Sequence, residues 1–546
     1  MAMVNGSQIL ARSLRRLHTD TFFYIMGGPM MAAESACLEE GLRAIDVRHE
    51  QAAAMMAHAY GRVKNTLGVC MAASGPAATN LITGVANAWA DCAPLLAIGW
   101  SAPISQRGKS AFQEMDQVAA FKPITKWAEQ CTDARRVPEF VTTAVRQSLS
   151  GRPGPVYLDM PGDVLYKQVD EDEIIYPEAD PASFRARPSG DAALIDDALR
   201  LLAQAERPLV LTGSGILWSD AAAELQQLVE LFGLPFYTTP QGRGVVPDDH
   251  ALSFPTARAT AFREADLLLL IGTRVNYIIG HLAAPRFNAS AKLIQVDIDG
   301  TEISHNRPAD VGIVGDARAV LRQLLAAGDG RVDSRRFSAW REHLSSVERM
   351  KRAEAETAMS TDQQPIHPLR LCKEVRDFLD RDAILVVDGQ EILNYGRQSI
   401  PTFVPRHRLN SGVFGTMGVG LPFGLGAKVA KSDKQVLVLH GDGSFGLNGM
   451  ELDTAARHKI PVVTVVSLNG GWTADPKREK AGRDLGYTAF HKMAEALGCH
   501  GEYVEEPAAI RPALDRAFAC GDPALVNVLT DWRARATTAA FSVYST

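Results

Sequence analysis

The sequence of 546 residues has few of the features that mark specialised classes of protein. Its 7 cysteines form no Cys-x-x-Cys pair, which argues against a disulfide framework or a zinc site and favours a reducing compartment. No run of about eighteen apolar residues occurs, so no segment is expected to span a membrane. The 57 basic and 63 acidic residues leave a net charge of −6, so neither nucleic acid nor an anionic membrane is expected as a partner. We expect a cytoplasmic protein whose cysteines act as small buried hydrophobes.

The sequence does have ample apolar content and two segments suited to be linkers. Hydrophobic residues make up 46% and charged residues 22% of the chain, which is enough to build several cores. Segments 169–191 and 331–368 are rich in charge and contain proline, so domain boundaries are expected there. They predict domains at residues 1–168, 192–330 and 369–532, followed by a tail at 533–546.

Short apolar runs alternate with amphipathic segments in all three parts. Runs such as 66–74, 265–274 and 461–471 are rich in Val, Ile and Leu and end in Gly or polar residues. Continuous runs of this length predict parallel strands that helices cover on both faces. The predicted fold class is therefore α/β, with three consecutive doubly wound domains and mostly parallel sheets. Ligands of such sheets bind at the carboxyl ends of the strands.

Two apolar runs of the third part end in segments suited to a cation and a phosphate. One ends in GDGS, residues 441–444, and the next ends in NGG, residues 469–471. A right-handed crossover brings the ends of two such strands together. Oxygens from Asp442, Asn469 and a backbone carbonyl suit a hard cation such as Mg²⁺, while the glycines let backbone N–H groups approach phosphates. A plain strand-to-helix turn is the alternative interpretation.

With this motif the sequence resembles the thiamine-diphosphate-dependent enzymes of the acetolactate synthase, benzaldehyde lyase, 2-hydroxyacyl-CoA lyase and oxalyl-CoA decarboxylase group. The resemblance extends from Gly27 to about Leu529. It implies a pyrimidine-binding first domain, a diphosphate-binding third domain, and Mg²⁺ held by Asp442, Asn469 and the carbonyl of Gly471. The cofactor-binding residues that it implies are Gly27, Gly28, Glu50, Gly415, Met417, Gly441, Gly443, Ser444, Trp472 and Thr473.

The same resemblance implies two catalytic residues. Glu50, in RHE before an Ala-rich segment, matches the glutamate whose carboxyl bonds the aminopyrimidine ring nitrogen and promotes loss of the thiazolium proton. Gln113, in FQE, matches a polar contact facing the reacting centre. From the residues alone, Glu50 is equally well explained as the first residue of a helix, and Gln113 as a solvated side chain.

The middle part lacks a full GxGxxG motif, so its Rossmann signal is weak. The resemblance allows ADP there, as in oxalyl-CoA decarboxylase, FAD, as in acetolactate synthases, or no nucleotide. Asp297 follows an apolar run and suits a pair of ribose hydroxyls. The residues that match the ADP-contacting set are Arg152, Gly213, Gly215, Arg274, Asp297 and Asp316.

The expected function is a thiamine-diphosphate- and Mg²⁺-dependent carbon–carbon lyase or carboligase acting on small 2-hydroxy carbonyl compounds. The preferred version resembles 2-hydroxyacyl-CoA lyase, with a CoA thioester as substrate and formyl-CoA plus an aldehyde or ketone as products. The alternatives are a benzaldehyde lyase, an acetolactate synthase, or a degenerate nucleotide-binding relative. Thr473 replaces a tyrosine common in the CoA-dependent group, and Pro29 replaces the histidine of benzaldehyde lyase. In the family two subunits share each active site, so a homodimer or homotetramer is expected.

Overall fold

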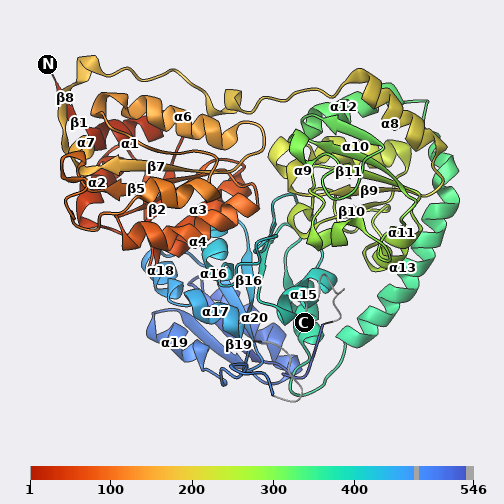
Figure 1. The fold of residues 1–546 in the computed structure, drawn as a ribbon. Helices are drawn as coiled ribbons and strands as arrows, with labels where there is room; N and C mark the ends of the chain where they lie inside the picture. Colours follow the sequence, from red (N-terminus) through yellow and green to blue (C-terminus); the bar gives the residue numbers. More distant parts are fainter. Residues whose placement is uncertain (1, 473–478, 537–546) are drawn as a thin grey trace.

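The computed structural model describes residues 2–472 and 479–536 as three lobes, each built on its own sheet (Figure 1). In the view of Figure 1 the N-terminal lobe lies at upper left, the central lobe at upper right and the C-terminal lobe below them. The segment that follows the N-terminal lobe crosses the top of the molecule to helix α8, Ala192–Gln204. The C-terminal lobe contacts both of the others: its Ser411 carbonyl accepts from the Asn87 side chain (2.9 Å), and its Arg397 carbonyl accepts from the Arg243 side chain (2.9 Å).

The N-terminal lobe contains a six-stranded parallel sheet in the order β3-β2-β4-β5-β7-β6. Alternate residues of its strands face opposite layers: Val69 and Met71 pack with helices α1, α2 and α6, whereas Cys70 and Ala72 pack with α3 and α4. This alternation follows from the two-residue period of a strand. The strands are β2 Thr21–Tyr24, β3 Arg43–Asp46, β4 Gly68–Ala72, β5 Leu95–Ser101, β6 Ala128–Gln130 and β7 Pro155–Pro161, and the helices are α1 Gly6–Arg16, α2 Met31–Glu39, α3 Glu50–Lys64, α4 Pro76–Ala90 and α6 Val137–Leu149.

The central lobe contains a five-stranded parallel sheet in the order β10-β9-β11-β12-β13. Its core lies in two layers, one on each face of the sheet. The long helix α13, Ser338–Met359, runs along the right edge of the molecule toward the C-terminal lobe, and its Trp340 and Leu344 are buried against the central lobe. The remaining elements are β9 Pro208–Thr212, β10 Phe236–Thr238, β11 Leu267–Ile271, β12 Lys292–Asp297, β13 Val311–Val314, α9 Ser214–Ser219, α10 Ala222–Phe232, α11 Arg258–Glu264 and α12 Ala317–Gly328.

The C-terminal lobe contains a six-stranded parallel sheet in the order β15-β14-β16-β17-β19-β18. The prediction of three α/β domains with mostly parallel sheets is confirmed, and the exception is the small antiparallel pair of β1, Met3–Asn5, and β8, Gln168–Asp170. The elements of this lobe are β14 Ile384–Asp388, β15 Arg408–Leu409, β16 Val436–Gly441, β17 Val463–Leu468, β18 His500–Val504, β19 Ala524–Leu529, α14 Pro368–Phe378, α15 Glu391–Ser399, α16 Gly420–Ala430, α17 Asp442–Asn448, α18 Glu451–Arg457, α19 Phe490–Ala496 and α20 Ile510–Ala519.

Helix α3 of the N-terminal lobe packs against α16 of the C-terminal lobe, so these two lobes share one apolar core. Ala52 and Met56 lie in the same buried cluster as Leu421 and Phe423. A Cβ added at Gly426 would lie 2.3 Å from the backbone oxygen of Met56, so only glycine permits this close helix crossing. The helix that begins at Glu50 is therefore held firmly against the third lobe.

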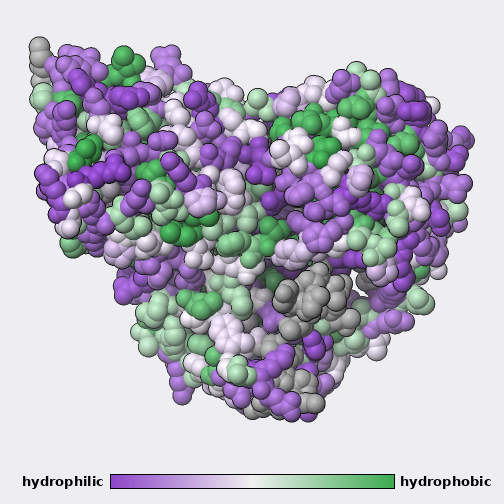
Figure 2. All heavy atoms as spheres, viewed as in Figure 1, coloured by the Kyte–Doolittle hydropathy of each residue, from purple (hydrophilic) through white to green (hydrophobic). Residues whose placement is uncertain are grey.

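The surface and the cysteines fit an ordinary globular chain. Figure 2 shows hydrophilic side chains spread over the visible face of all three lobes, with apolar atoms in small groups between them. The cysteines are free, and all are buried except Cys520, which departs from the expectation of buried thiols. Among the described residues no helix combines the length and apolar composition needed to cross a membrane.

Candidate active site

The GDGS segment forms the junction between strand β16 and helix α17. Asp442 is the first residue of α17, and Asp442 and Ser444 are both buried. The Ser444 hydroxyl donates to the Gly441 carbonyl (3.0 Å) and pairs with Nδ1 of His440 (3.0 Å), so it braces the turn from within. A Cβ at Gly443 would lie 2.6 Å from the Trp472 ring, so this glycine lets the indole lie directly on the turn.

The NGG segment lies directly beside Asp442, because β16 and β17 pair in parallel. Asp442 Oδ2 accepts hydrogen bonds from the amides of Gly470 (2.7 Å) and Gly471 (3.1 Å). The side-chain oxygen of Asn469 accepts from the same Gly471 amide (3.1 Å). The two side-chain oxygens predicted to bind a cation thus converge on one point, and burial raises the pKa of Asp442 to about 6.

Arg483 holds the NGG loop in place, and the sequence analysis did not identify it. Its guanidinium is buried and donates to the carbonyls of Gly470 (3.1 Å) and Asn469 (3.3 Å). Its own carbonyl accepts from the Trp472 amide (3.0 Å). Arg483 lies outside the motif, in a charge-rich stretch of sequence, so no local pattern separates it from a surface arginine.

A glycine-rich loop before α16 brings Met417 to the same place. Gly412, Gly415 and Gly418 all have positive φ angles of 64°, 70° and 85°, which L side chains rarely adopt. The Gly418 carbonyl accepts from the Asn448 side chain (2.7 Å), which ties the loop to α17. Gly415 is exposed at the outer part of this loop.

One cavity unites most of the predicted residues of the third lobe. It is lined by Met417, Gly441, Asp442, Gly443, Ser444, Asn469, Gly471 and Trp472, together with Pro368 of α14, the residues that follow β14 into α15, Ser467 of β17 and the segment after β19. Gly415 is not among the lining residues, and Thr473 lies outside the described residues. Six segments far apart in sequence therefore converge at the carboxyl ends of β14, β16 and β17, as expected for a parallel sheet.

The predicted residues of the N-terminal lobe lie elsewhere. Glu50 begins α3, is half-buried, and accepts a hydrogen bond from the Asn80 side chain (2.9 Å). Within the described part of the chain, none of Gly27, Gly28, Glu50 and Gln113 lines the cavity around Asp442. The structure of one chain thus assembles two separate groups of predicted residues.

Gln113 occupies a constrained position at the end of this lobe's sheet. Its φ angle is 55°, which is unusual for a residue other than glycine, and such strain concentrates at functional sites. Its side-chain oxygen accepts from the Ser74 hydroxyl (2.8 Å). A Cβ at Gly75 would lie 2.8 Å from the Gln113 Cβ, so the two loops pack closely. The Gln113 side chain is therefore held rather than freely solvated.

Gly27 and Gly28 form the entry to a short helical turn after β2. A Cβ at Gly27 would lie 2.4 Å from the Cβ of Ala73, whereas one at Gly28 would meet nothing within 4 Å. Gly27 thus serves close packing between loops. Gly28 is exposed and leaves open space on its outer side.

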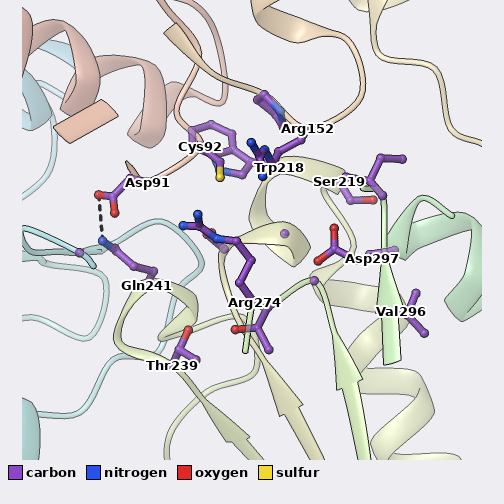
Figure 3. A pocket seen from close by; sticks show the side chains of 18 of the residues that line it. Asp91, Cys92, Arg152, Trp218, Ser219, Thr239, Gln241, Arg274, Val296 and Asp297 are labelled. Atoms are coloured by element: carbon purple, nitrogen blue, oxygen red, sulfur yellow. Dashed lines mark hydrogen bonds between the residues drawn. The ribbon is translucent and has the colours of Figure 1, made fainter. Parts of the chain in front are cut away.

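A large pocket lies where the three lobes meet (Figure 3). Its empty volume is about 1210 Å³, open solvent at its mouth included. The predicted nucleotide residues Arg152, Gly215, Arg274, Asp297 and Asp316 line it, and Figure 3 shows Arg274 and Asp297 facing the space below Arg152 and Trp218. Gly213 does not line it; a Cβ there would lie 2.7 Å from the Thr273 hydroxyl, so this glycine permits close packing of two strand ends.

The charges of this pocket favour an anion. Five arginines and three aspartates line it: Arg152, Arg185, Arg187, Arg274, Arg397, Asp91, Asp297 and Asp316. Asp316 is already engaged, because it accepts from the Ser219 hydroxyl (2.7 Å) and caps α12 through the Ala319 amide (3.1 Å). Asp297 lies at the carboxyl end of β12, and burial raises its pKa to about 6.

Three family models match successive parts of the chain. The thiamine pyrophosphate enzyme N-terminal TPP binding domain matches residues 4–120, the central domain residues 195–324, and the C-terminal TPP binding domain residues 394–528. The chain belongs to the thiamine pyrophosphate enzyme family.

Curated members of this family are similar along nearly the whole chain. A probable acetolactate synthase of Mycobacterium bovis is 35% identical over 541 residues, which cover 97% of this chain and 96% of the relative. A 2-hydroxyacyl-CoA lyase of Arabidopsis thaliana is 33% identical over 97% and 96% of the two chains. The human 2-hydroxyacyl-CoA lyase 1 is 32% identical over 97% and 95%. The chain is thus a thiamine-pyrophosphate-dependent enzyme that acts on carbon–carbon bonds.

The residues of the third lobe fit the family's cofactor. The oxygens of Asp442 and Asn469 form a hard donor set, and Asp442 has no cationic side chain hydrogen-bonded to it among the described residues. Gly443 and Gly471 carry no side chain over the turn, so backbone groups stay accessible there. This environment suits a divalent cation with a diphosphate.

Proposed function

We propose that this enzyme is a thiamine-diphosphate- and Mg²⁺-dependent lyase that cleaves, and in reverse forms, the carbon–carbon bond of 2-hydroxy carbonyl compounds. The convergence of Asp442, Asn469 and Met417 at the carboxyl ends of neighbouring strands supports this proposal best. In the preferred version the substrate is a 2-hydroxyacyl-CoA and the products are formyl-CoA and an aldehyde or ketone. The similarity to two 2-hydroxyacyl-CoA lyases supports that version.

Each residue of the proposed site has one task. Asp442, Asn469 and the Gly471 carbonyl hold the cation, and Met417 supports the body of the cofactor. Glu50 holds a proton at the pyrimidine ring nitrogen, and Asn80 orients its carboxyl group. Gln113, fixed by Ser74, binds the substrate oxygen. When bound, the cofactor supplies a nucleophilic carbon and an electron sink for the cleavage.

We infer that two copies of the chain share each site. The N-terminal residues Glu50 and Gln113 and the cavity around Asp442 are separate in one chain. Apolar side chains next to both groups are exposed: Phe112 by 72%, Met26 by 64% and Phe414 by 54%. Exposed apolar groups of this kind mark protein interfaces. Association of two copies would bury them and bring the groups together in a homodimer or homotetramer.

We also propose that the pocket between the lobes binds ADP. Five arginines suit the diphosphate, and Asp297 at the end of β12 suits the ribose hydroxyls. Stabilisation by ADP in a thermal-shift titration, reduced in an Arg274→Ala variant, is the expected result. A flavin absorption spectrum of the purified protein would instead assign FAD to this pocket.

A product assay tests the proposed reaction. The enzyme with Mg²⁺ and thiamine diphosphate is incubated separately with a 2-hydroxyacyl-CoA, with pyruvate and with benzoin. Formyl-CoA and an aldehyde from the first substrate support the preferred version. Acetolactate from pyruvate would support a second candidate, which the similarity to the Mycobacterium bovis protein favours. Benzaldehyde from benzoin would assign an acyloin lyase.

A binding assay tests the cofactor separately. Thiamine diphosphate with Mg²⁺ is expected to raise the melting temperature of the wild-type protein but not that of an Asp442→Asn variant. Asp433→Asn, at a surface carboxylate, is the control and should behave as wild type. No stabilisation of the wild type would contradict the assignment.

A further inference from the structure

Glu451 is a buried carboxylate that links the third lobe to the turn before Glu50. It is the first residue of α18 and is only 1% exposed. Its Oε1 accepts hydrogen bonds from the backbone amides of Arg48 and His49, both at 3.1 Å, and its Oε2 accepts from the Thr454 hydroxyl at 2.6 Å. The two amides belong to the residues immediately before Glu50, which begins α3.

The last residue of α18, Arg457, and the residue after it, His458, contact the same segment. The Arg457 guanidinium donates to the Asp46 carbonyl (3.0 Å), and Nε2 of His458 lies 2.7 Å from the Asp46 carboxylate. Asp46 ends strand β3, four residues before Glu50. Both ends of α18 therefore hold the segment that leads from β3 into α3.

A carboxylate in this place is costly to bury, so its hydrogen bonds decide whether the arrangement is stable. Burial raises the pKa of Glu451 to about 7. The Arg48 and His49 amides donate to it, and the Thr454 hydroxyl gives a third bond. Both amides donate to the same oxygen, so a glutamine could still accept from them, whereas an alanine would leave two buried N–H groups without their partner and release the turn.

This turn sets where the Glu50 side chain begins. Because α3 is packed against α16, the helix as a whole cannot shift easily, but its first residue depends on the preceding turn. We propose that Glu451 is a positioning residue for Glu50, and that it controls how fast the bound thiamine diphosphate loses the proton of its reactive carbon. The inference rests on the proposed function, because it assigns Glu50 to that proton transfer.

The chain offers a closely matched control in Glu348 of helix α13. Glu348 is 6% exposed, and its carboxylate also accepts from two backbone amides, those of Thr256 (2.8 Å) and Ala257 (3.1 Å), and from the Thr256 hydroxyl (2.6 Å). It lies against the central lobe, away from Glu50. A Glu→Ala change at either position removes the acceptor of two backbone amides, and at Glu348 it also removes an ion pair with Arg352 (2.9 Å).

The test compares Glu451→Ala, Glu348→Ala and wild-type holoenzymes. Hydrogen–deuterium exchange at the reactive carbon of the cofactor is measured by acid quench and proton NMR, next to the melting temperature and the affinity for thiamine diphosphate with Mg²⁺. We expect Glu451→Ala to slow exchange by about 10- to 100-fold, as removal of supporting hydrogen bonds does elsewhere, with cofactor affinity nearly unchanged. Glu348→Ala should lower the melting temperature without slowing exchange.

Two results would overturn the inference. Exchange at the wild-type rate in Glu451→Ala would show that the turn does not depend on this carboxylate. Equal slowing in both variants would show a general loss of stability instead of positioning. If wild-type enzyme fails to accelerate exchange beyond that of free cofactor, the proposed function itself fails, and the inference falls with it.

Discussion

Glu50 lies where an ordinary helix-starting residue would lie, and its carboxylate accepts a hydrogen bond from the Asn80 side chain (2.9 Å). A glutamate retained merely as the first residue of a helix would tolerate an amide, because the charge–dipole interaction contributes only about 0.3–1 kcal/mol. A proton-transferring glutamate would not tolerate it. The two interpretations of this residue therefore differ in chemistry more than in stability.

We predict that Glu50→Gln retains cofactor binding and loses turnover. Mg²⁺-dependent binding of thiamine diphosphate should persist, since Asp442 and Asn469 are untouched, whereas proton exchange at the cofactor should fall by about 100-fold or more. Binding is followed by thermal shift and exchange by NMR. An Asn80→Ala variant, which keeps the carboxyl group, should show a smaller loss. Wild-type exchange in Glu50→Gln would contradict the assignment.

Glu34 gives a pH-dependent prediction near the Gly27 loop. Burial raises the pKa of Glu34 from 4.5 to about 7, and the backbone amide of Gly27 opposes this shift only in part. The protonated form is thus favoured in the folded state, so its contribution to stability is complete below pH 4.5 and is lost as the pH rises through about 7. A Glu34→Gln variant avoids this loss.

The melting temperatures of wild type and Glu34→Gln should therefore diverge with pH. The melting temperature of the variant should rise relative to that of the wild type between pH 5 and pH 8, because only the wild type must bury a charge at the higher pH. Differential scanning fluorimetry at several pH values measures the difference. A difference in melting temperature that is the same at pH 5 and at pH 8 would mean that Glu34 does not titrate in this range.

At the scale of elements, the contact of α3 with α16 joins the lobe of Glu50 to the lobe of Asp442. A Gly426→Ala substitution would place a Cβ 2.3 Å from the Met56 carbonyl oxygen, so the helices must separate. Overpacking of this kind costs about 1–3 kcal/mol. We expect a lower melting temperature of the variant without cofactor.

Gly300→Ala is the matched control for this helix contact. A Cβ there would lie 3.5 Å from Val314, an ordinary contact, and the Gly300 φ angle is not positive. Its melting temperature should stay close to that of wild type. Equal effects of the two substitutions would show that the crossing of α3 and α16 is not the sensitive contact.

Sequence patterns predicted elements well where apolar runs were continuous. The run 265–274 contains β11 and the run 461–471 contains β17, because strands buried on both faces need apolar residues at every position. The packing of helix α13 on the central lobe was harder to predict from the sequence. Helix α13 lies in a charge-rich segment, and only its few apolar residues, such as Trp340 and Leu344, reach the core.

At the scale of the whole molecule, the separation of Glu50 from the cavity around Asp442 leads to a complementation test. Glu50→Gln and Asp442→Asn variants, each inactive alone, are unfolded together, refolded as a mixture and assayed. If sites are shared, a mixed dimer has one site with both intact residues, and random pairing restores about a quarter of wild-type activity. Separate refolding of each variant is the control.

The same test has a clear contrary outcome. If each chain builds its own site, every site in the mixture carries one defect and no activity returns. Sedimentation analysis of the mixture shows whether dimers formed. Inactive mixed dimers would contradict the proposed sharing of sites between two copies.

The sequence by itself determined the fold class and which residues of the proposed cation site would lie close together. Asp442, Asn469 and Gly471 could be predicted because each follows a continuous apolar run, and parallel strands place such ends together. Gly443 belongs to the same motif, and the structure adds a reason for glycine there, because a Cβ would lie 2.6 Å from the Trp472 ring.

Only the tertiary structure decided which distant side chains support these motifs. Arg483 holds the NGG loop, Glu451 holds the turn before Glu50, and five arginines from separate lobes meet in one pocket. Such residues lie far from their partners in sequence or in unremarkable polar stretches, and a hydrogen bond depends on positions in space. Periodicity reports which face of an element is buried, whereas contacts between lobes arise only when the elements have packed.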